Sequence, residues 1–139
     1  MRDAILAIDQ GTTSSRVVLF GLDGAVLQLF QHEFSSNYPQ SGWVEQDANA
    51  IWDDMFRLCS EAVAYASLND LRIDSMGITN QRETVVFFDK TTQLALSPAI
   101  VWQDRRTTEA CRKLIDNGHS EFIRQRTGLV IDPYFSASK

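Results

Sequence analysis

The first third of the chain alternates between short apolar runs and polar turns, a pattern that predicts β-strands joined by hairpins. Apolar residues fill positions 4–8, and a run rich in β-branched and aromatic residues fills positions 16–20. Asp23-Gly24, a common hairpin pair, then leads to a third apolar stretch at positions 25–34. We therefore expect an antiparallel three-stranded sheet with two tight connections.

The next segment changes to a helical period. Asp47 is a favourable N-cap residue, and apolar residues follow it at spacings of three and four. One line of them consists of Ile51, Met55, Leu58, Ala62 and Ala66. A second line beside it consists of Trp52, Phe56, Cys59 and Val63. The two lines together predict a helix that is buried along a broad stripe against the sheet.

The second half of the chain contains shorter elements. Three apolar runs predict strands at residues 73–78, 85–88 and 100–102. A helix is then expected to end near Asn117, with Asp104 or Thr107 as its cap and Gly118 as its stop signal. A second short helix is expected over residues 120–126. Strands followed by a helix and further strands predict a mixed α/β sheet.

Composition places the chain among ordinary globular proteins. It has 139 residues, of which 44% are hydrophobic and 22% charged, and these values exclude collagen-like, disordered and coiled-coil proteins. A net charge of −5 offers no basic stripe, so we expect no nucleic-acid partner. No apolar run approaches the ~20 residues that span a bilayer, and the N-terminus does not resemble a signal peptide. We expect a cytoplasmic protein in which Cys59 and Cys111 are reduced.

A hydroxyl-rich turn between the first two strands is the first candidate for chemistry. Residues 9–16 have the sequence Asp-Gln-Gly-Thr-Thr-Ser-Ser-Arg. Gly11 lets a ligand approach the backbone closely, and the hydroxyl and amide donors of the turn suit phosphate oxygens. Asp9 could hold a hydrated Mg²⁺ ion, with the positive charge of Arg16 nearby. The alternative is a plain hairpin turn whose hydroxyls satisfy its own backbone.

Other candidates lie in the second half of the chain. Arg82 and Glu83 place guanidinium donors beside carboxylate acceptors, a combination that suits a small polyol. Both can reach one ligand only if the preceding strand ends or bends there; otherwise they form a solvated ion pair of little energy. Trp102 could cover the carbon face of a ligand or belong to the core. Tyr134 could supply a hydroxyl to a pocket or pack as an aromatic ring near the end of the chain.

Taken together, five segments resemble the FGGY carbohydrate kinases of the actin-like ATPase superfamily, and within them the members that act on glycerol. The segments are residues 8–16, 42–45, 77–84, 99–103 and 127–136. The resemblance runs from about Ala4 to Lys139. Its most specific part is Asn-Gln-Arg-Glu-Thr at residues 80–84, because relatives that act on larger sugars differ at the Arg-Glu positions.

This resemblance implies a ribonuclease-H-like α/β lobe that takes part in ATP-dependent phosphorylation of glycerol to sn-glycerol 3-phosphate. It implies that Asp9 is the Mg²⁺-associated carboxylate. The implied nucleotide-binding residues are Thr12, Thr13, Ser14 and Arg16. The implied glycerol-binding residues are Thr12, Arg82, Glu83, Trp102 and Tyr134. The family also implies a homo-oligomer for the complete enzyme.

Members of this family are several times longer than 139 residues. We therefore expect this chain to be the N-terminal portion of the first domain. The general base and the adenine-binding domain would lie outside it. On that expectation the chain alone is inactive, and an exposed apolar side causes it to self-associate. Two other functions stay open: a kinase for another small polyol or sugar, and a non-catalytic actin-like module that binds a nucleotide or a partner protein.

Overall fold

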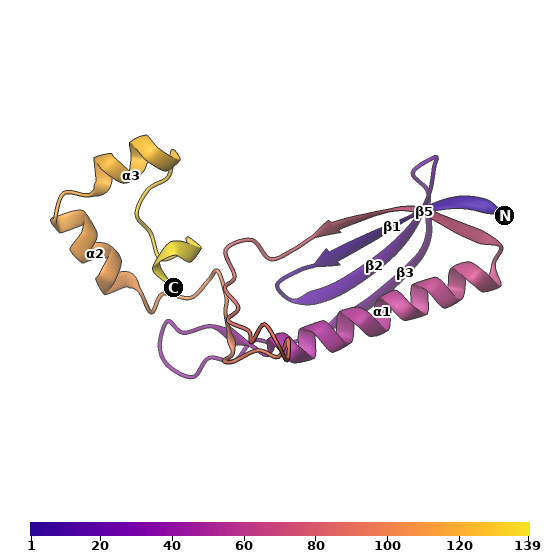
Figure 1. The fold of residues 1–139 in the computed structure, drawn as a ribbon, viewed down its shortest axis with the longest axis horizontal. Helices are drawn as coiled ribbons and strands as arrows, with labels where there is room; N and C mark the ends of the chain where they lie inside the picture. Colours follow the sequence, from indigo (N-terminus) through magenta and orange to yellow (C-terminus); the bar gives the residue numbers. More distant parts are fainter. The chain divides into compact units, whose positions relative to one another are not determined.

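The computed structural model describes all 139 residues, and they form two compact units. The first unit consists of Met1–Ser35 and Asp47–Gln81. The second consists of Ser36–Gln46 and Arg82–Lys139. In Figure 1 the first unit is the part built from long strands and one long helix, and the second unit contains the short helices near the C-terminus.

The first unit contains a four-stranded sheet with the spatial order β3-β2-β1-β5 (Figure 1). Its strands are β1 (Arg2–Gln10), β2 (Ser14–Gly21), β3 (Val26–Glu33) and β5 (Leu71–Thr79). Strand β2 pairs antiparallel with β1 and β3, whereas β5 pairs parallel with β1. Parallel neighbours need a crossover connection, which helix α1 (Ala48–Leu68) provides. The predicted antiparallel meander and the mixed sheet are both confirmed.

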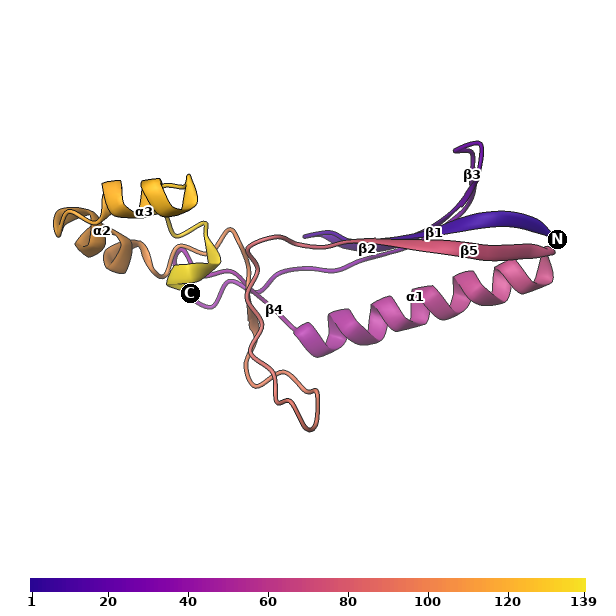
Figure 2. The same ribbon diagram turned by 45° about the horizontal axis from the view of Figure 1, so that its top comes forward.

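Helix α1 begins at the predicted cap and lies along one face of the sheet (Figure 2). One carboxylate oxygen of Asp47 accepts hydrogen bonds from the backbone N–H of Asn49 at 2.9 Å and of Ala50 at 3.1 Å. These bonds satisfy two donors that the first turn of a helix leaves unpaired. The buried core of the unit joins the helix to two strands through Leu6, Val17, Leu19, Leu58, Ala62 and Ala66.

A polar link at the side of this core ties α1 to β3. Asp54 Oδ1 lies 3.0 Å from His32 Nδ1 and 2.6 Å from Arg57 Nη2. Burial raises the pKa of Asp54, but the hydrogen bond from Arg57 and the interaction with His32 outweigh burial and leave that pKa below its ordinary value. Helix α1 is therefore held to β3 by a polar contact between side chains as well as by apolar packing.

The predicted width of the buried helix stripe is wrong. Trp52, Phe56 and Val63 are 68%, 65% and 54% exposed, although the sequence pattern placed them in the buried face. Consecutive helix positions are about 100° apart, and a single flat sheet covers only one narrow line of them. That line contains the small residues Ala62 and Ala66, which allow close approach to the strands. Trp52, Phe56 and Val63 of the second line face solvent instead, whereas Cys59 is partly buried and packs against the core.

The second unit contains a small sheet and three short helical segments. Its strands are β4 (Glu45–Gln46) and β6 (Ala99–Ile100), which pair antiparallel. Its helices are α2 (Thr108–Asp116), α3 (Ser120–Thr127) and the 3₁₀ turn η1 (Ser136–Ser138). Both predicted helices are confirmed, and each is followed by a glycine in the left-handed region, Gly118 at φ 81° and Gly128 at φ 75°. None of the helices in either unit combines the length and apolar character that a bilayer crossing requires.

One strand prediction in this unit is wrong. Residues 85–88 form only isolated bridges, Val85 with Ile100 and Phe88 with Ala95. A tight turn explains why the pairing of residues 85–88 is so short. The Asp89 side chain accepts hydrogen bonds from the backbone N–H groups of Thr91 and Thr92, so the chain reverses there. The short strand expected at 100–102 is present with shifted bounds, as β6 over Ala99–Ile100, and it pairs with β4 in a separate two-stranded sheet.

The exposed apolar residues of the first unit lead to a prediction about association. Trp52 and Phe56 on α1, together with Met76 and Ile78 on β5, are each more than half exposed. Burying such side chains gains about 2 kcal/mol each, so we expect the 139-residue chain to self-associate. Sedimentation velocity should show oligomers that shift toward monomer when Trp52 and Phe56 are both replaced by Ser.

The matched control replaces Ser60 and Glu61, exposed polar residues of the same helix, by Ala. This double variant should sediment like the unaltered chain. A clean monomer for the unaltered chain at every concentration would contradict the prediction.

Candidate functional site

The hydroxyl-rich turn joins β1 to β2 at one end of the first unit's sheet. The backbone N–H of Gly11 donates to the carbonyl of Ser14 at 3.0 Å and closes the turn. A Cβ atom at Gly11 would lie 3.0 Å from that carbonyl oxygen, so a side chain there would require the backbone of the turn to shift slightly. The carbonyl of Thr13 accepts from the N–H of Phe34 at 3.0 Å, which ties the turn to the chain beyond β3. The turn is thus held in one shape by its backbone.

Asp9 and Arg16 form an ion pair beside this turn. They are directly opposite each other in the antiparallel pairing of β1 and β2, so their side chains share a face. Arg16 Nη1 lies 3.2 Å from Asp9 Oδ2, and the two side chains are 43% and 40% exposed. Such a half-exposed pair contributes little stability. The ion pair places a carboxylate and a guanidinium side by side at the end of the sheet.

The hydroxyls of the turn differ in how accessible they are. Thr13 is exposed, whereas Ser14 and Ser15 are buried. Ser15 Oγ donates to Gln10 Oε1 at 2.9 Å, so that hydroxyl serves the turn itself. The hydroxyl oxygen of Ser14 is buried with no hydrogen-bond partner, which is costly for a polar group. One hydroxyl of the turn, that of Ser15, therefore stabilises the hairpin, and another, that of Ser14, has no hydrogen-bond partner.

In the second unit, Glu83 is held by the segment that follows Tyr134. Glu83 has a left-handed backbone with φ 68°, and its Oε2 accepts from both the N–H and the Oγ of Ser136 at 2.8 Å. These two hydrogen bonds, the backbone one first, hold the pKa of Glu83 below its usual value. Lys139 Nζ donates to the carbonyl oxygens of Glu83 at 3.1 Å and of Tyr134 at 2.8 Å. The carboxylate is thereby fixed as an ionised acceptor.

Trp102 and Tyr134 lie next to this carboxylate segment. Their rings pack edge to face with centroids 5.7 Å apart, and Tyr134 packs against Phe135 at 5.0 Å. The backbone N–H of Trp102 donates to Thr84 Oγ1 at 3.2 Å, which links the tryptophan to the residue after Glu83. The second unit thus brings three predicted glycerol-binding residues together. The fourth, Arg82, is exposed, and its charge helps to lower the pKa of Glu83. The fifth, Thr12, belongs to the turn between β1 and β2 in the first unit.

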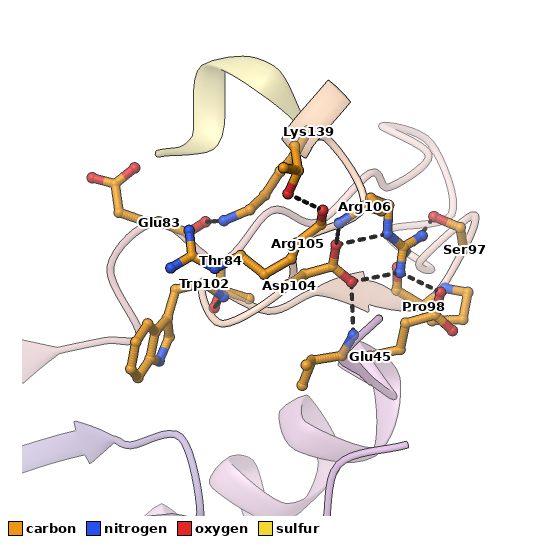
Figure 3. Close-up of polar contacts among 12 residues, drawn as sticks. Glu45, Glu83, Thr84, Ser97, Pro98, Trp102, Asp104, Arg105, Arg106 and Lys139 are labelled. Carbon is orange, nitrogen blue, oxygen red and sulfur yellow. Dashed lines mark hydrogen bonds and ion pairs between the residues drawn. The ribbon is translucent and has the colours of Figure 1, made fainter. Parts of the chain in front are cut away.

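A buried carboxylate, Asp104, anchors the loop that carries Trp102 (Figure 3). Asp104 is 0% exposed; its Oδ2 accepts from the backbone N–H of Val44 at 2.7 Å. Arg106 binds both oxygens of Asp104, through Nε at 3.0 Å and Nη2 at 2.9 Å, and also reaches Glu45 at 2.7 Å. Burial raises the pKa of Asp104, but these hydrogen bonds and the charge of Arg106 outweigh it and lower that pKa.

Sequence reasoning missed the roles of Asp104 and Ser136. The sequence predicts either Asp104 or Thr107 as the cap of α2, and the structure has Thr107 at the N-cap position. One available signal for the burial of Asp104 is that it lies two residues after the apolar run at 100–102. Ser136 gave no signal, because its contact with Glu83 joins residues 53 positions apart. The roles of the nine predicted site residues remain predictions.

Comparisons with known proteins place these features in a family context. The chain matches the model described as the FGGY family of carbohydrate kinases, N-terminal domain, over residues 4–139. It is 49% identical over 135 residues to the glycerol kinase of Alcanivorax borkumensis and 50% identical over 135 residues to that of Rhodopseudomonas palustris. Each match covers 97% of this chain and 27% of the relative, so the chain spans about a quarter of their length.

Solved structures show the same relationship. The crystal structure of Plasmodium falciparum glycerol kinase with ADP matches with a TM-score of 0.91 and 31% identity, over 98% of this chain and 27% of that one. A ligand-bound xylulose kinase from Lactobacillus acidophilus matches with a TM-score of 0.83 at 19% identity, over 95% of this chain and 26% of that one. The second match shows a shared fold.

The Asp104 network predicts how the stability of the second unit depends on pH. A carboxyl whose pKa is lowered by folding adds stability above its unfolded pKa of about 3.9, and that stability is lost as pH falls through the folded pKa. Asp104→Asn should lower the free energy of unfolding by about 3 kcal/mol at neutral pH, because it leaves Arg106 without its buried partner. In this variant the free energy of unfolding should also decrease less steeply as the pH falls below about 4.

Urea unfolding at neutral and acidic pH measures both effects. Asp116→Asn, at the exposed C-terminal end of α2, is the matched control and should change neither value. An unaltered pH dependence in Asp104→Asn would contradict the assigned role of the buried carboxylate.

Proposed function

The chain belongs to the FGGY family of carbohydrate kinases, and from this membership we propose that it takes part in ATP-dependent phosphorylation of glycerol to sn-glycerol 3-phosphate. The observation that carries the proposal is the cluster of Glu83, Trp102 and Tyr134 in the second unit. The chain is 49–50% identical in sequence to two glycerol kinases over 135 residues, which supports glycerol rather than a larger sugar as the substrate. We propose that these residues form the N-terminal portion of the first domain of a kinase as long as those relatives.

The chemistry of the second unit's cluster suits a small polyol. In the proposal, Glu83 accepts hydrogen bonds from two glycerol hydroxyls, and Arg82 donates to their oxygens. Tyr134 adds a hydroxyl that both donates and accepts, and the Trp102 ring covers the carbon backbone. The contacts of Glu83 with Ser136 and of Trp102 with Tyr134 support this assignment, because they hold both groups in place before a ligand arrives.

In the proposal, the turn of the first unit binds the phosphates of ATP. Thr12, Thr13 and Ser14 supply hydroxyl and amide donors, and Arg16 supplies positive charge. The unpartnered hydroxyl of Ser14 supports this role, since a phosphate oxygen would satisfy it after a small rearrangement of the turn. We also propose that Thr12 contacts glycerol.

Asp9 fits a magnesium ion in this arrangement. Mg²⁺ is commonly held by one or two carboxylates together with waters and phosphate oxygens, and Asp9 offers one such carboxylate, 40% exposed. Within the chain, no group of three or more metal-ligating side chains is assembled. When bound, the ion would supply positive charge to the phosphates of ATP. Asp9 itself would orient the ion's hydration shell.

The proposed reaction is a direct phosphoryl transfer. A terminal hydroxyl oxygen of glycerol bonds to the γ-phosphorus, the bond from that phosphorus to the β–γ bridging oxygen breaks, and ADP leaves with the electron pair. The hydroxyl proton passes to a general base, for which no residue of this chain is assigned. The residues of the chain contribute positioning and charge stabilisation, which dominate catalysis of this reaction.

The proposal extends to the setting of the protein. We propose a cytoplasmic homo-oligomer, as the family resemblance implies.

The direct test is an assay of a kinase of the relatives' full length that carries this chain. With ATP and Mg²⁺, it should form sn-glycerol 3-phosphate and ADP in equal amounts, and it should prefer glycerol in a panel of polyols and sugars. Preference for a longer sugar alcohol would instead support the alternative kinase. If no polyol or sugar in the panel is phosphorylated but the protein still binds a partner, that result would support a non-catalytic actin-like module.

Replacement of Arg82 tests the polyol site. In the same full-length protein, Arg82→Ala should raise the KM for glycerol by roughly tenfold or more and leave the KM for ATP nearly unchanged, because it removes hydrogen bonds from a charged donor. Steady-state kinetics measures both values.

The control for that substitution is Arg112→Ala, which removes an exposed arginine of α2. Its kinetic constants should equal those of the unaltered protein. An equal rise of both KM values in Arg82→Ala would place Arg82 outside the polyol site.

A further inference from the structure

The backbone at Glu83 adopts a conformation that needs outside support. Its φ of 68° lies in the left-handed region, which residues with a side chain rarely adopt. A regular strand would point Arg82 and Glu83 to opposite faces. Glu83 lies beyond the end of β5 at Thr79, and its bent backbone removes that alternation. The orientation of the carboxylate therefore depends on the contacts that stabilise the bend.

Those contacts come from a segment more than fifty residues later. Ser136 approaches Glu83 Oε2 with two donors, its backbone N–H and its hydroxyl, each at 2.8 Å. Lys139 Nζ lies 3.1 Å from the Glu83 carbonyl oxygen (Figure 3). Both donors of Ser136 take the same carboxylate oxygen, which leaves Oε1 to accept from a ligand. Glu83 is thus held at its side chain and at its backbone.

We propose that Ser136 is a positioning residue for polyol recognition, an inference that rests on the proposed function of Glu83. The backbone N–H of Ser136 and, after it, the Ser136 hydroxyl lower the pKa of Glu83, and together they fix which carboxylate oxygen faces the ligand. Three neighbouring groups act on the same carboxylate in one direction: the hydrogen bonds of Ser136, and the positive charges of Lys139 and Arg82, all favour its ionised form. A polyol hydroxyl can donate only to an ionised or otherwise unprotonated oxygen, so this arrangement extends polyol binding to lower pH.

The position of Ser136 also links Glu83 to the aromatic pair. Ser136 begins the turn η1 two residues after Tyr134, and Lys139 donates to the Tyr134 carbonyl at 2.8 Å as well as to that of Glu83. One short segment therefore sets the carboxylate and the tyrosine ring together. A neighbouring serine, Ser138, has other partners, Thr107 Oγ1 at 2.9 Å and the Phe135 carbonyl at 3.4 Å, and does not contact Glu83.

The kinetic experiment compares three variants in the full-length kinase that carries this chain. Ser136→Ala removes the hydroxyl donor and keeps the backbone donor, Ser136→Thr keeps both, and Ser138→Ala removes the neighbouring hydroxyl. We expect Ser136→Ala to raise the KM for glycerol by roughly tenfold, with the KM for ATP unchanged, and to move the acid limb of kcat/KM to higher pH. Ser136→Thr should restore both values, and Ser138→Ala should alter neither.

A second measurement separates this inference from the proposed function. The pKa of Glu83 is measured by ¹³C NMR titration of the side-chain carboxyl in the 139-residue chain, using the monomeric Trp52/Phe56 double variant as background if the chain associates. Ser136→Ala should raise that pKa, and Ser136→Thr should leave it low. If the unaltered kinase does not phosphorylate glycerol but the pKa of Glu83 shifts as expected in the Ser136 variants, only the proposed substrate is refuted. An unchanged pKa, or a raised KM without a shift of the acid limb, would overturn the positioning role of Ser136.

Discussion

The second unit depends on the burial of one carboxylate. Asp104 is fully enclosed, and a buried charge is tolerated only when it is paired and hydrogen-bonded. Arg106 supplies the opposite charge in bidentate form and is itself stacked over the Trp43 ring, with its Cζ 3.7 Å from the ring centroid. The backbone N–H of Val44 supplies the remaining donor. This network joins β4, the end of β6 and the start of the helical segment, in a unit with few buried apolar residues.

The first unit is organised by apolar packing instead. Helix α1 packs small residues against the strands, and the parallel pairing of β1 with β5 follows from the crossover that the helix makes. The same geometry fixes the turn between β1 and β2, because Asp9 and Arg16 are opposite each other at the sheet end. The sheet therefore presents a hydroxyl-rich turn whose shape is fixed by backbone hydrogen bonds. This is how binding groups are commonly placed on a scaffold.

In the proposed function, the two units serve different halves of a phosphoryl transfer. The hydroxyl-rich turn offers donors and positive charge, and the cluster around Glu83 offers an ionised acceptor beside aromatic rings. Phosphoryl transfer needs little covalent participation from the protein, so positioning is the main requirement on both sides. The strained backbone at Glu83 and the unpartnered hydroxyl of Ser14 are local departures from good protein geometry. Such departures concentrate at binding sites.

Local signals in the sequence determined the meander, the start of α1 at Asp47, the helices that end before Gly118 and Gly128, and the segments that carry the family resemblance. Each depends on neighbours within a few positions, which is why the pattern alone sufficed. Tertiary structure decided that Trp52 and Phe56 face solvent, because the number of strands beneath a helix sets how much of it is covered. It also decided that Asp104 is buried and that Ser136 holds Glu83, since these contacts join residues 60 and 53 positions apart. The spacing of apolar residues along the sequence does not indicate which residues so far apart will be in contact.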